Sequence, residues 1–208
     1  LNSQTYQKGV VVGQGIVDTD GKRRGLYKEF YPDSTLRAEG VFVEGQRSGE
    51  WKFYYHNGQV QEIGFYNEGQ PDGIWTWYYE NGHKQIEEQF FKGTPNGSYK
   101  EYDSRGNTIV TGTYFDGMKN GKWIEEIGDM RTQGEYRNDK QVGEWVSYYD
   151  NDKLAFKGTF NAGYPDGEHF FYYQNGRLRE IQKYAAGVKH GDWKKYLEPG
   201  ELYFTVTY

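Results

Sequence analysis

Aromatic and β-branched residues occur along the chain in short runs that begin just after a glycine and end before a turn signal. The run from Glu50 to Tyr55, which contains Trp51, Phe53 and Tyr54, is typical of them. Runs of this composition, bounded by glycine, predict β-strands. No segment has the periodicity of an amphipathic helix, so the pattern predicts an all-β protein.

The runs recur at a fixed interval, which is the main organising feature of the sequence. Each begins at what we call an opening glycine, and successive opening glycines are 24 residues apart, with one interval of 22. The opening glycines are Gly25, Gly49, Gly73, Gly97, Gly121, Gly143, Gly167 and Gly191. Self-similarity at such a period predicts a repeat protein with about eight units.

Two kinds of connection alternate within each unit. Nine residues after the opening glycine stands a turn signal such as Asn57-Gly58. Asn-Gly favours a type I′ turn, in which both central residues have positive φ, so we expect a tight turn here. The second connection runs between two glycines, as in Gly69 to Gly73, and contains Pro and Asp, which predicts a looser turn.

Connections this short join antiparallel neighbours, so the strands should pair in sequence order. The sequence therefore predicts an elongated, single-layer antiparallel β-meander or solenoid of about eight 24-residue hairpin repeats, with about sixteen strands. Residues 25–208 would form one continuous array, and residues 1–24 an N-terminal segment with a degenerate half repeat. The last strand, 201–208, could leave an open sheet edge through which chains self-associate.

Two rows of aromatic residues are candidate binding residues. Because positions two and five after the opening glycine differ in parity, the rows should face opposite sides of a regular sheet, unless a bulge turns one row. Each row could be a binding strip or the thin core of the repeat array. The first row contains Trp51, Trp75, Tyr99, Trp123, Trp145 and Trp193, and the second contains Tyr54, Tyr78, Tyr102, Tyr148, Tyr172 and Tyr196.

Two places depart from the repeat. The unit 121–142 is two residues shorter, lacks Asn-Gly at its turn near Gly128, and has Asp139 where the other units have a spacer glycine. A neutral deletion in a tolerant hairpin explains this best, and a local acidic patch or a kink are the alternatives. His169 stands at the position of the first aromatic row, where we expect a packed ring or a surface substitution, not a ligand.

Composition narrows the function classes. The chain has no cysteine, a net charge of −5 and no clustered Lys/Arg stripe, which argues against disulfides, thiolate metal sites and nucleic-acid binding. No apolar run approaches the length of a transmembrane helix. No residues stand at the spacing of a metal site, a catalytic pair or a phosphate loop, so we expect a non-catalytic protein without cofactors.

The repeat grammar resembles the MORN-repeat superfamily, and more closely its bacterial variant: Gly-x-Trp, a Tyr-Tyr run, Asn-Gly, a second strand and a spaced Gly. The resemblance covers about residues 15–208. It implies an extended antiparallel β-ribbon used for binding or scaffolding. Some bacterial members are known as antitoxins, which would imply sequestration of a protein toxin.

The leading functional hypothesis is a protein-interaction or scaffold module with an unidentified protein partner. The alternatives are a carbohydrate or cell-wall binding module, an antitoxin, and a purely structural spacer. The chain begins at Leu1, which fits either a removed export signal or a trimmed chain, and we favour export to the periplasm or cell envelope.

Overall fold

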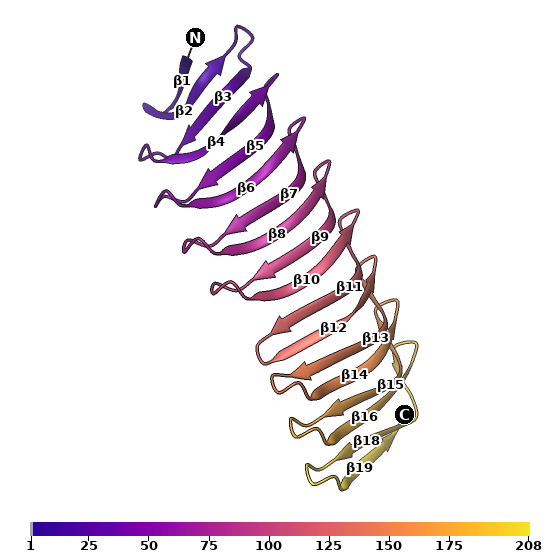
Figure 1. The fold of residues 1–208 in the computed structure, drawn as a ribbon. Helices are drawn as coiled ribbons and strands as arrows, with labels where there is room; N and C mark the ends of the chain where they lie inside the picture. Colours follow the sequence, from indigo (N-terminus) through magenta and orange to yellow (C-terminus); the bar gives the residue numbers. More distant parts are fainter. Residues whose placement is uncertain (1) are drawn as a thin grey trace. The chain divides into compact units, whose positions relative to one another are not determined.

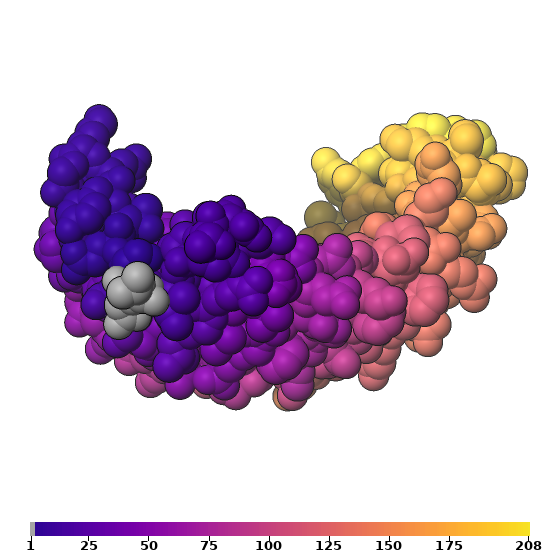
Figure 2. Space-filling view, turned by 90° about the horizontal axis from the view of Figure 1, so that it is seen from above, coloured from indigo at the N-terminus to yellow at the C-terminus, as the bar shows by residue number. Residues whose placement is uncertain are grey.

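The computed structural model describes residues 2–208, and every regular element in that range is a β-strand (Figure 1). The chain divides into two compact units, the first ending at Thr108 and the second running from Ile109 to Tyr208. In the space-filling view, the first unit forms a curved layer whose colour changes from indigo to magenta along the chain (Figure 2).

The first unit is an antiparallel meander in which each strand pairs with the next one in sequence. Its strands are β1 (Asn2–Gln7), β2 (Val10–Val17), β3 (Arg23–Phe30), β4 (Leu36–Val43), β5 (Gln46–Tyr54), β6 (Val60–Asn67), β7 (Gln70–Tyr78), β8 (Lys84–Phe91) and β9 (Thr94–Tyr102).

The second unit repeats this order. Its strands are β10 (Thr108–Phe115), β11 (Met118–Ile127), β12 (Met130–Arg137), β13 (Lys140–Tyr149), β14 (Leu154–Asn161), β15 (Tyr164–Tyr172), β16 (Leu178–Ala185), β17 (Val188–Lys189), β18 (Asp192–Tyr196) and β19 (Leu202–Thr207). The short β17 and β18 both pair with β16, so together they take the place of one strand.

These strands confirm the predicted all-β, single-layer antiparallel meander. The eight predicted hairpins account for β3 to β19, and the N-terminal segment adds β1 and β2 to the sixteen strands expected. Strand β2 places Gly15 against the ring of Tyr27, so it acts as the return strand of a leading repeat. Strand β1 was not expected.

The two connections of each repeat have the opposite roles from those predicted. At Asn57-Gly58 only the glycine has positive φ (83°), and the Gly58 N–H donates to the carbonyl of Tyr55 at 2.9 Å. The loop is therefore a three-residue type I turn closed by a left-handed glycine, and the type I′ prediction was wrong. Asn57 acts through its side chain, whose Oδ1 accepts the N–H of Gln59 at 2.9 Å.

The type I′ geometry occurs at the connection that was expected to be looser. Glu68 and Gly69 both have positive φ, 49° and 78°, and they join β6 directly to β7. The segment from Gln70 to Gly73 is therefore strand, not loop. Gly73 has a φ of 75° at a bulge where the pairing of β6 with β7 changes register, which is why a glycine opens each repeat.

The short repeat keeps its pairing in register. Residues from Gly121 to Ile127 in β11 pair without a register shift with Tyr136 back to Met130 in β12. A two-residue turn replaces the three-residue loop of the other repeats, and Gly128 supplies the positive φ of 61°. This geometry supports a deletion that shortens the loop and leaves the hairpin intact.

Candidate functional site

The first aromatic row lies on one side of the sheet, which we call the tryptophan face in each unit. Trp51 is 0% exposed and Trp75 is 2% exposed. Each indole lies over a glycine in the return strand of the preceding repeat: a Cβ on Gly40 would be 2.4 Å from Trp51, and one on Gly64 would be 2.0 Å from Trp75. The same arrangement holds Trp123 over Gly112 and Trp145 over Gly134, with both indoles buried.

Hydrogen bonds and ring contacts complete the environment of these indoles. Trp51 Nε1–H donates to the carbonyl of Val41 at 3.0 Å, and Trp75 donates to that of Phe65 at 3.1 Å. The edges of neighbouring rings pack against the indoles, as Phe42 does against Trp51 with centroids 5.0 Å apart at 81°. The burial favours packing over ligand binding for this row.

Three members of the row deviate in instructive ways. Tyr99 pairs with Glu88, so no glycine lies opposite it, and the smaller tyrosine ring is only half-buried. Trp193 is also half-buried. The residue eleven positions before it is Gln182, where the other tryptophans of the row have a glycine. His169 is 3% exposed, lies over Gly158 and contacts the carbonyl of Thr159 through Nε2 at 2.7 Å, so it is a packed ring.

The second aromatic row points to the opposite face, as the parity of its positions predicted, and its six tyrosines are half-buried. The Tyr54 hydroxyl donates to Glu39 Oε1 at 2.6 Å, and the Tyr102 hydroxyl donates in the same way to Glu87. Partial burial, together with the adjacent carboxylate, raises the pKa of each of these two tyrosines to about 12. Tyr78, Tyr148, Tyr172 and Tyr196 occupy the equivalent positions.

A third series of tyrosines, which was not predicted as a functional set, ties five of the repeats to the repeat that follows. The Tyr55 hydroxyl donates to the carbonyl of Tyr78 at 2.6 Å, and the Tyr79 hydroxyl to that of Tyr102 at 2.8 Å. The equivalent donors are Tyr31, Tyr149 and Tyr173. The signal was the second residue of each Tyr-Tyr pair, which recurs with the repeat.

The opposite face of the first unit also carries an exposed row of apolar side chains, which we call the apolar strip. Leu26 is 79% exposed, Phe65 50% and Ile74 62%. Val41 pairs directly with Leu26, and Ile16 shares a pocket of about 550 Å³ with it. Strip residues therefore lie on β2, β3, β4, β6 and β7, and on β5 the corresponding position is taken by Glu50, which pairs with Phe65.

The second unit has no counterpart to this strip at the corresponding repeat positions. Polar residues occupy these positions there: Thr113, Lys122, Glu135, Glu144, Thr159, Glu168, Lys183 and Asp192. The apolar strip is therefore a property of particular repeats and is not needed for the hairpin fold.

Ion pairs border the apolar strip. Lys28 Nζ lies 3.5 Å from Glu39 Oε2, and Lys52 Nζ lies 3.3 Å from Glu50 Oε1. Glu39, Glu50 and both lysines also line a pocket of about 400 Å³ that includes Leu26. The charges of the border thus pair with each other and leave the strip without a dominant sign.

Among residues 2–208, no group of three or more His, Asp or Glu side chains is arranged to hold a metal ion. The same range contains no helix long and apolar enough to cross a membrane. The absence of catalytic activity and of a cofactor stays a prediction.

Comparison with known families agrees with the repeat geometry. A family profile described as the MORN repeat variant matches residues 47–68, 71–92, 141–162 and 165–186. Each match begins two residues before an opening glycine, just after a type I′ turn, and ends at the first residue of the next such turn. No curated protein matches the chain. The repeats outside the matched segments have the same order of strands and turns, and in the four matched segments the chain carries the MORN repeat variant.

Proposed function

We propose that this chain is a non-catalytic protein-interaction module and that the apolar strip of the first unit is its docking surface. The observation that carries this proposal is the exposure of Leu26, Phe65 and Ile74 in repeats whose fold does not require them. Scattered apolar residues on a surface are ordinary, but several large exposed apolar side chains along one row, bordered by polar residues, are typical of a protein interface.

The chemistry of the strip indicates the kind of partner. Its aliphatic and phenyl side chains offer no hydrogen-bond donors or acceptors, which would suit neither a glycan nor a nucleic acid as the main ligand. The bordering lysines and carboxylates neutralise each other, as Lys28 and Glu39 do. We therefore expect a partner that presents a row of apolar side chains with a polar margin and little net charge at its centre.

The test uses a variant whose new residues are already tolerated at these positions elsewhere in the chain. Leu26→Lys, Phe65→Glu and Ile74→Glu copy Lys122, Glu135 and Glu144. The triple variant should keep its unfolding midpoint within a few degrees, because exposed substitutions usually change stability by less than about 0.5 kcal/mol each. Affinity enrichment with the wild-type chain should recover a protein that the triple variant fails to recover.

The control is Ile127→Lys, which removes an equally exposed apolar side chain (72%) outside the strip. The recovered protein should bind the purified control variant with the wild-type Kd and the triple variant at least ~10-fold more weakly. Equal recovery by the triple variant would contradict the proposal. Glycan binding by the wild-type chain that the triple variant loses would replace it with a carbohydrate-binding function, whereas recovery of a toxin would define an antitoxin.

A further inference from the structure

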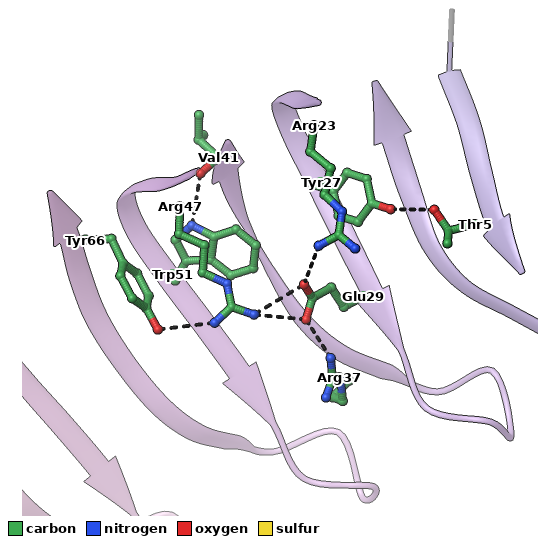
Figure 3. A network of polar contacts seen from close by, with 9 residues as sticks. All are labelled: Thr5, Arg23, Tyr27, Glu29, Arg37, Val41, Arg47, Trp51 and Tyr66. Carbon is green, nitrogen blue, oxygen red and sulfur yellow. Dashed lines mark hydrogen bonds and ion pairs between the residues drawn. The ribbon is translucent and has the colours of Figure 1, made fainter. Parts of the chain in front are cut away.

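A cluster of charged side chains lies on the tryptophan face of the first unit, where β3, β4 and β5 are neighbours (Figure 3). Its centre is Glu29, whose side chain is 7% exposed. Arg37 Nη2 donates to Oε2 at 2.7 Å, and Arg47 Nη2 donates to Oε1 and Oε2 at 3.2 and 3.1 Å. Arg23 Nη1 lies 3.5 Å from Oε1. Three cations against one carboxylate leave two positive charges unneutralised in a chain whose net charge is −5.

Other repeats show that the fold does not require this surplus of charge. The position of Glu29 is taken by Phe53 and by Phe171 in two other repeats. In the repeat where it is Glu125, a single cation suffices, with Lys119 Nζ at 2.8 Å. Buried ion pairs often contribute little net stability relative to apolar residues of similar volume. Stability alone therefore does not account for three arginines here.

Aromatic rings hold two of these arginines in place. The Arg23 guanidinium lies 4.8 Å from the ring centroid of Tyr27, and that of Arg47 lies 4.4 Å from Trp51. Arg47 Nη1 also donates to the Tyr66 hydroxyl at 3.2 Å. Because packing already restricts the Arg23 side chain, an anion that binds to it would lose less conformational entropy.

A pocket of about 370 Å³ adjoins the cluster, within the size range of ligand sites. Arg23 and Arg37 line it, with side chains 41% and 51% exposed, and Glu29 is the single acidic residue that contributes to its wall. The remaining wall is largely aromatic and apolar, with Tyr27 and Tyr31 among its residues. The lining thus carries one net positive charge, next to a surface that can pack against the carbon atoms of a ligand.

We propose that this pocket binds an organic carboxylate. A guanidinium has five N–H donors in a planar fork that matches a carboxylate, and among residues 2–208 Arg23 and Arg37 each direct one described side-chain hydrogen bond to Glu29. The aromatic and apolar wall can pack against the carbon skeleton of an organic acid, which inorganic phosphate lacks. The carboxylate is that of a small free acid or of an acidic side chain in a peptide.

This inference goes beyond the proposed function, because the pocket lies on the tryptophan face and the apolar strip on the opposite one. Isothermal titration and two-dimensional NMR of the full chain would use three probes: butyrate, a capped Gly-Glu-Gly peptide and inorganic phosphate. Both carboxylates should bind more tightly than phosphate. Tighter binding of the peptide than of butyrate identifies a peptide as the source, and the reverse order identifies a free acid.

Two substitutions remove the proposed donors and leave residues that other repeats already contain. Arg37→Gln copies Gln61, and Arg23→Gln copies Gln141. Each should weaken carboxylate binding at least ~10-fold, since a charge-assisted hydrogen bond contributes enough for such a change. Arg131→Gln, an arginine of the second unit paired with Asp152, is the matched control and should leave the affinity unchanged.

A third substitution moves the affinity in the other direction. Glu29→Gln removes the competing carboxylate, so it should strengthen carboxylate binding even though it lowers the stability of the free chain. A cluster with only a structural role would show no such gain. The proposal is overturned if neither carboxylate binds, if phosphate binds more tightly than both, or if Arg37→Gln and Arg23→Gln both bind as the wild type does.

Discussion

At the scale of single residues, the closest packing in this protein joins a ring in one repeat to a glycine in the repeat before it. Gly64 lies beneath Trp75 so closely that no β-carbon fits between them. Gly64 does not have positive φ, so contact with the ring, and not the backbone conformation, is what requires glycine at this position. The recurring tryptophans stand out in the sequence, whereas the role of the glycines that face them was not predicted.

This contact predicts the effect of Gly64→Ala. The added methyl group would overlap the indole of Trp75, and overpacking of this kind costs about 1–3 kcal/mol. Urea denaturation should show a lower free energy of unfolding by that amount. Glu88→Ala is the control, because Glu88 occupies the same repeat position opposite the smaller Tyr99 and should change stability by much less. Equal losses for the two variants would contradict the packing argument.

At the scale of elements, the strands follow from the aromatic runs, but the turns depend on backbone geometry that composition indicates only loosely. Asn57-Gly58 has the sequence of a type I′ turn, yet three residues form that loop and Asn57 contributes a side-chain hydrogen bond. The type I′ turn falls instead at Glu68-Gly69, where glutamate is an uncommon residue for positive φ. After this turn, β7 continues through a bulge at Gly73, where its pairing with β6 changes register.

The turn geometry predicts that Glu68→Asn stabilises the chain. Asparagine tolerates the left-handed backbone better than glutamate does, so the gain should be about 0.5 kcal/mol, seen as a higher midpoint in urea. The turn at Asn138 already uses asparagine with a φ of 50°. Gln59→Asn lies next to the other loop at a position without positive φ and should give no gain. A loss of stability in Glu68→Asn would mean that the turn is not type I′ in solution.

The charged cluster around Glu29 shows a further limit of sequence reasoning at this scale. Alternation along β4 would place Arg37 on the face away from Glu29, because Ala38 is the residue that pairs with Glu29. A register shift next to this pair lets the Arg37 side chain reach the carboxylate. Arg47 lies 18 residues after Glu29, on β5, so only the observed strand pairing shows that it joins the same cluster.

At the scale of the whole molecule, each repeat depends on its neighbours through contacts that recur every 24 residues. Within each unit, the indole of one repeat lies on the preceding return strand, and the hydroxyl of a tyrosine such as Tyr55 bonds to the following repeat. The period, the strand order and the two-sided placement of the aromatic rows could all be predicted from sequence, because they depend on spacing and parity. The protein that binds the apolar strip could not be predicted, because neither the spacing nor the parity of the aromatic residues depends on it.

The repeat period predicts different outcomes for two deletions in the first unit. Removing residues 49–72 deletes one whole repeat and brings Trp75 over Gly40, so the chain should still unfold cooperatively. Removing residues 49–60 deletes one strand, which reverses the direction of every later strand relative to the first ones. Circular dichroism during heating should show a sharp transition for the first deletion and a lower or broader one for the second. Equal midpoints with equal cooperativity would contradict the repeat assignment.

The placement of each ring on a glycine of the preceding repeat also bears on how such a chain can grow. Ring and glycine lie eleven residues apart in sequence, as Trp75 and Gly64 do. Any stretch of one full period therefore contains one ring position and one glycine position, and tandem copies of it restore the pairs wherever its ends fall. Unequal recombination can therefore lengthen or shorten the array without inventing a new contact. Surface residues such as those of the apolar strip can then diverge from copy to copy, because each new repeat already has the ring and glycine positions that pack it against its neighbours.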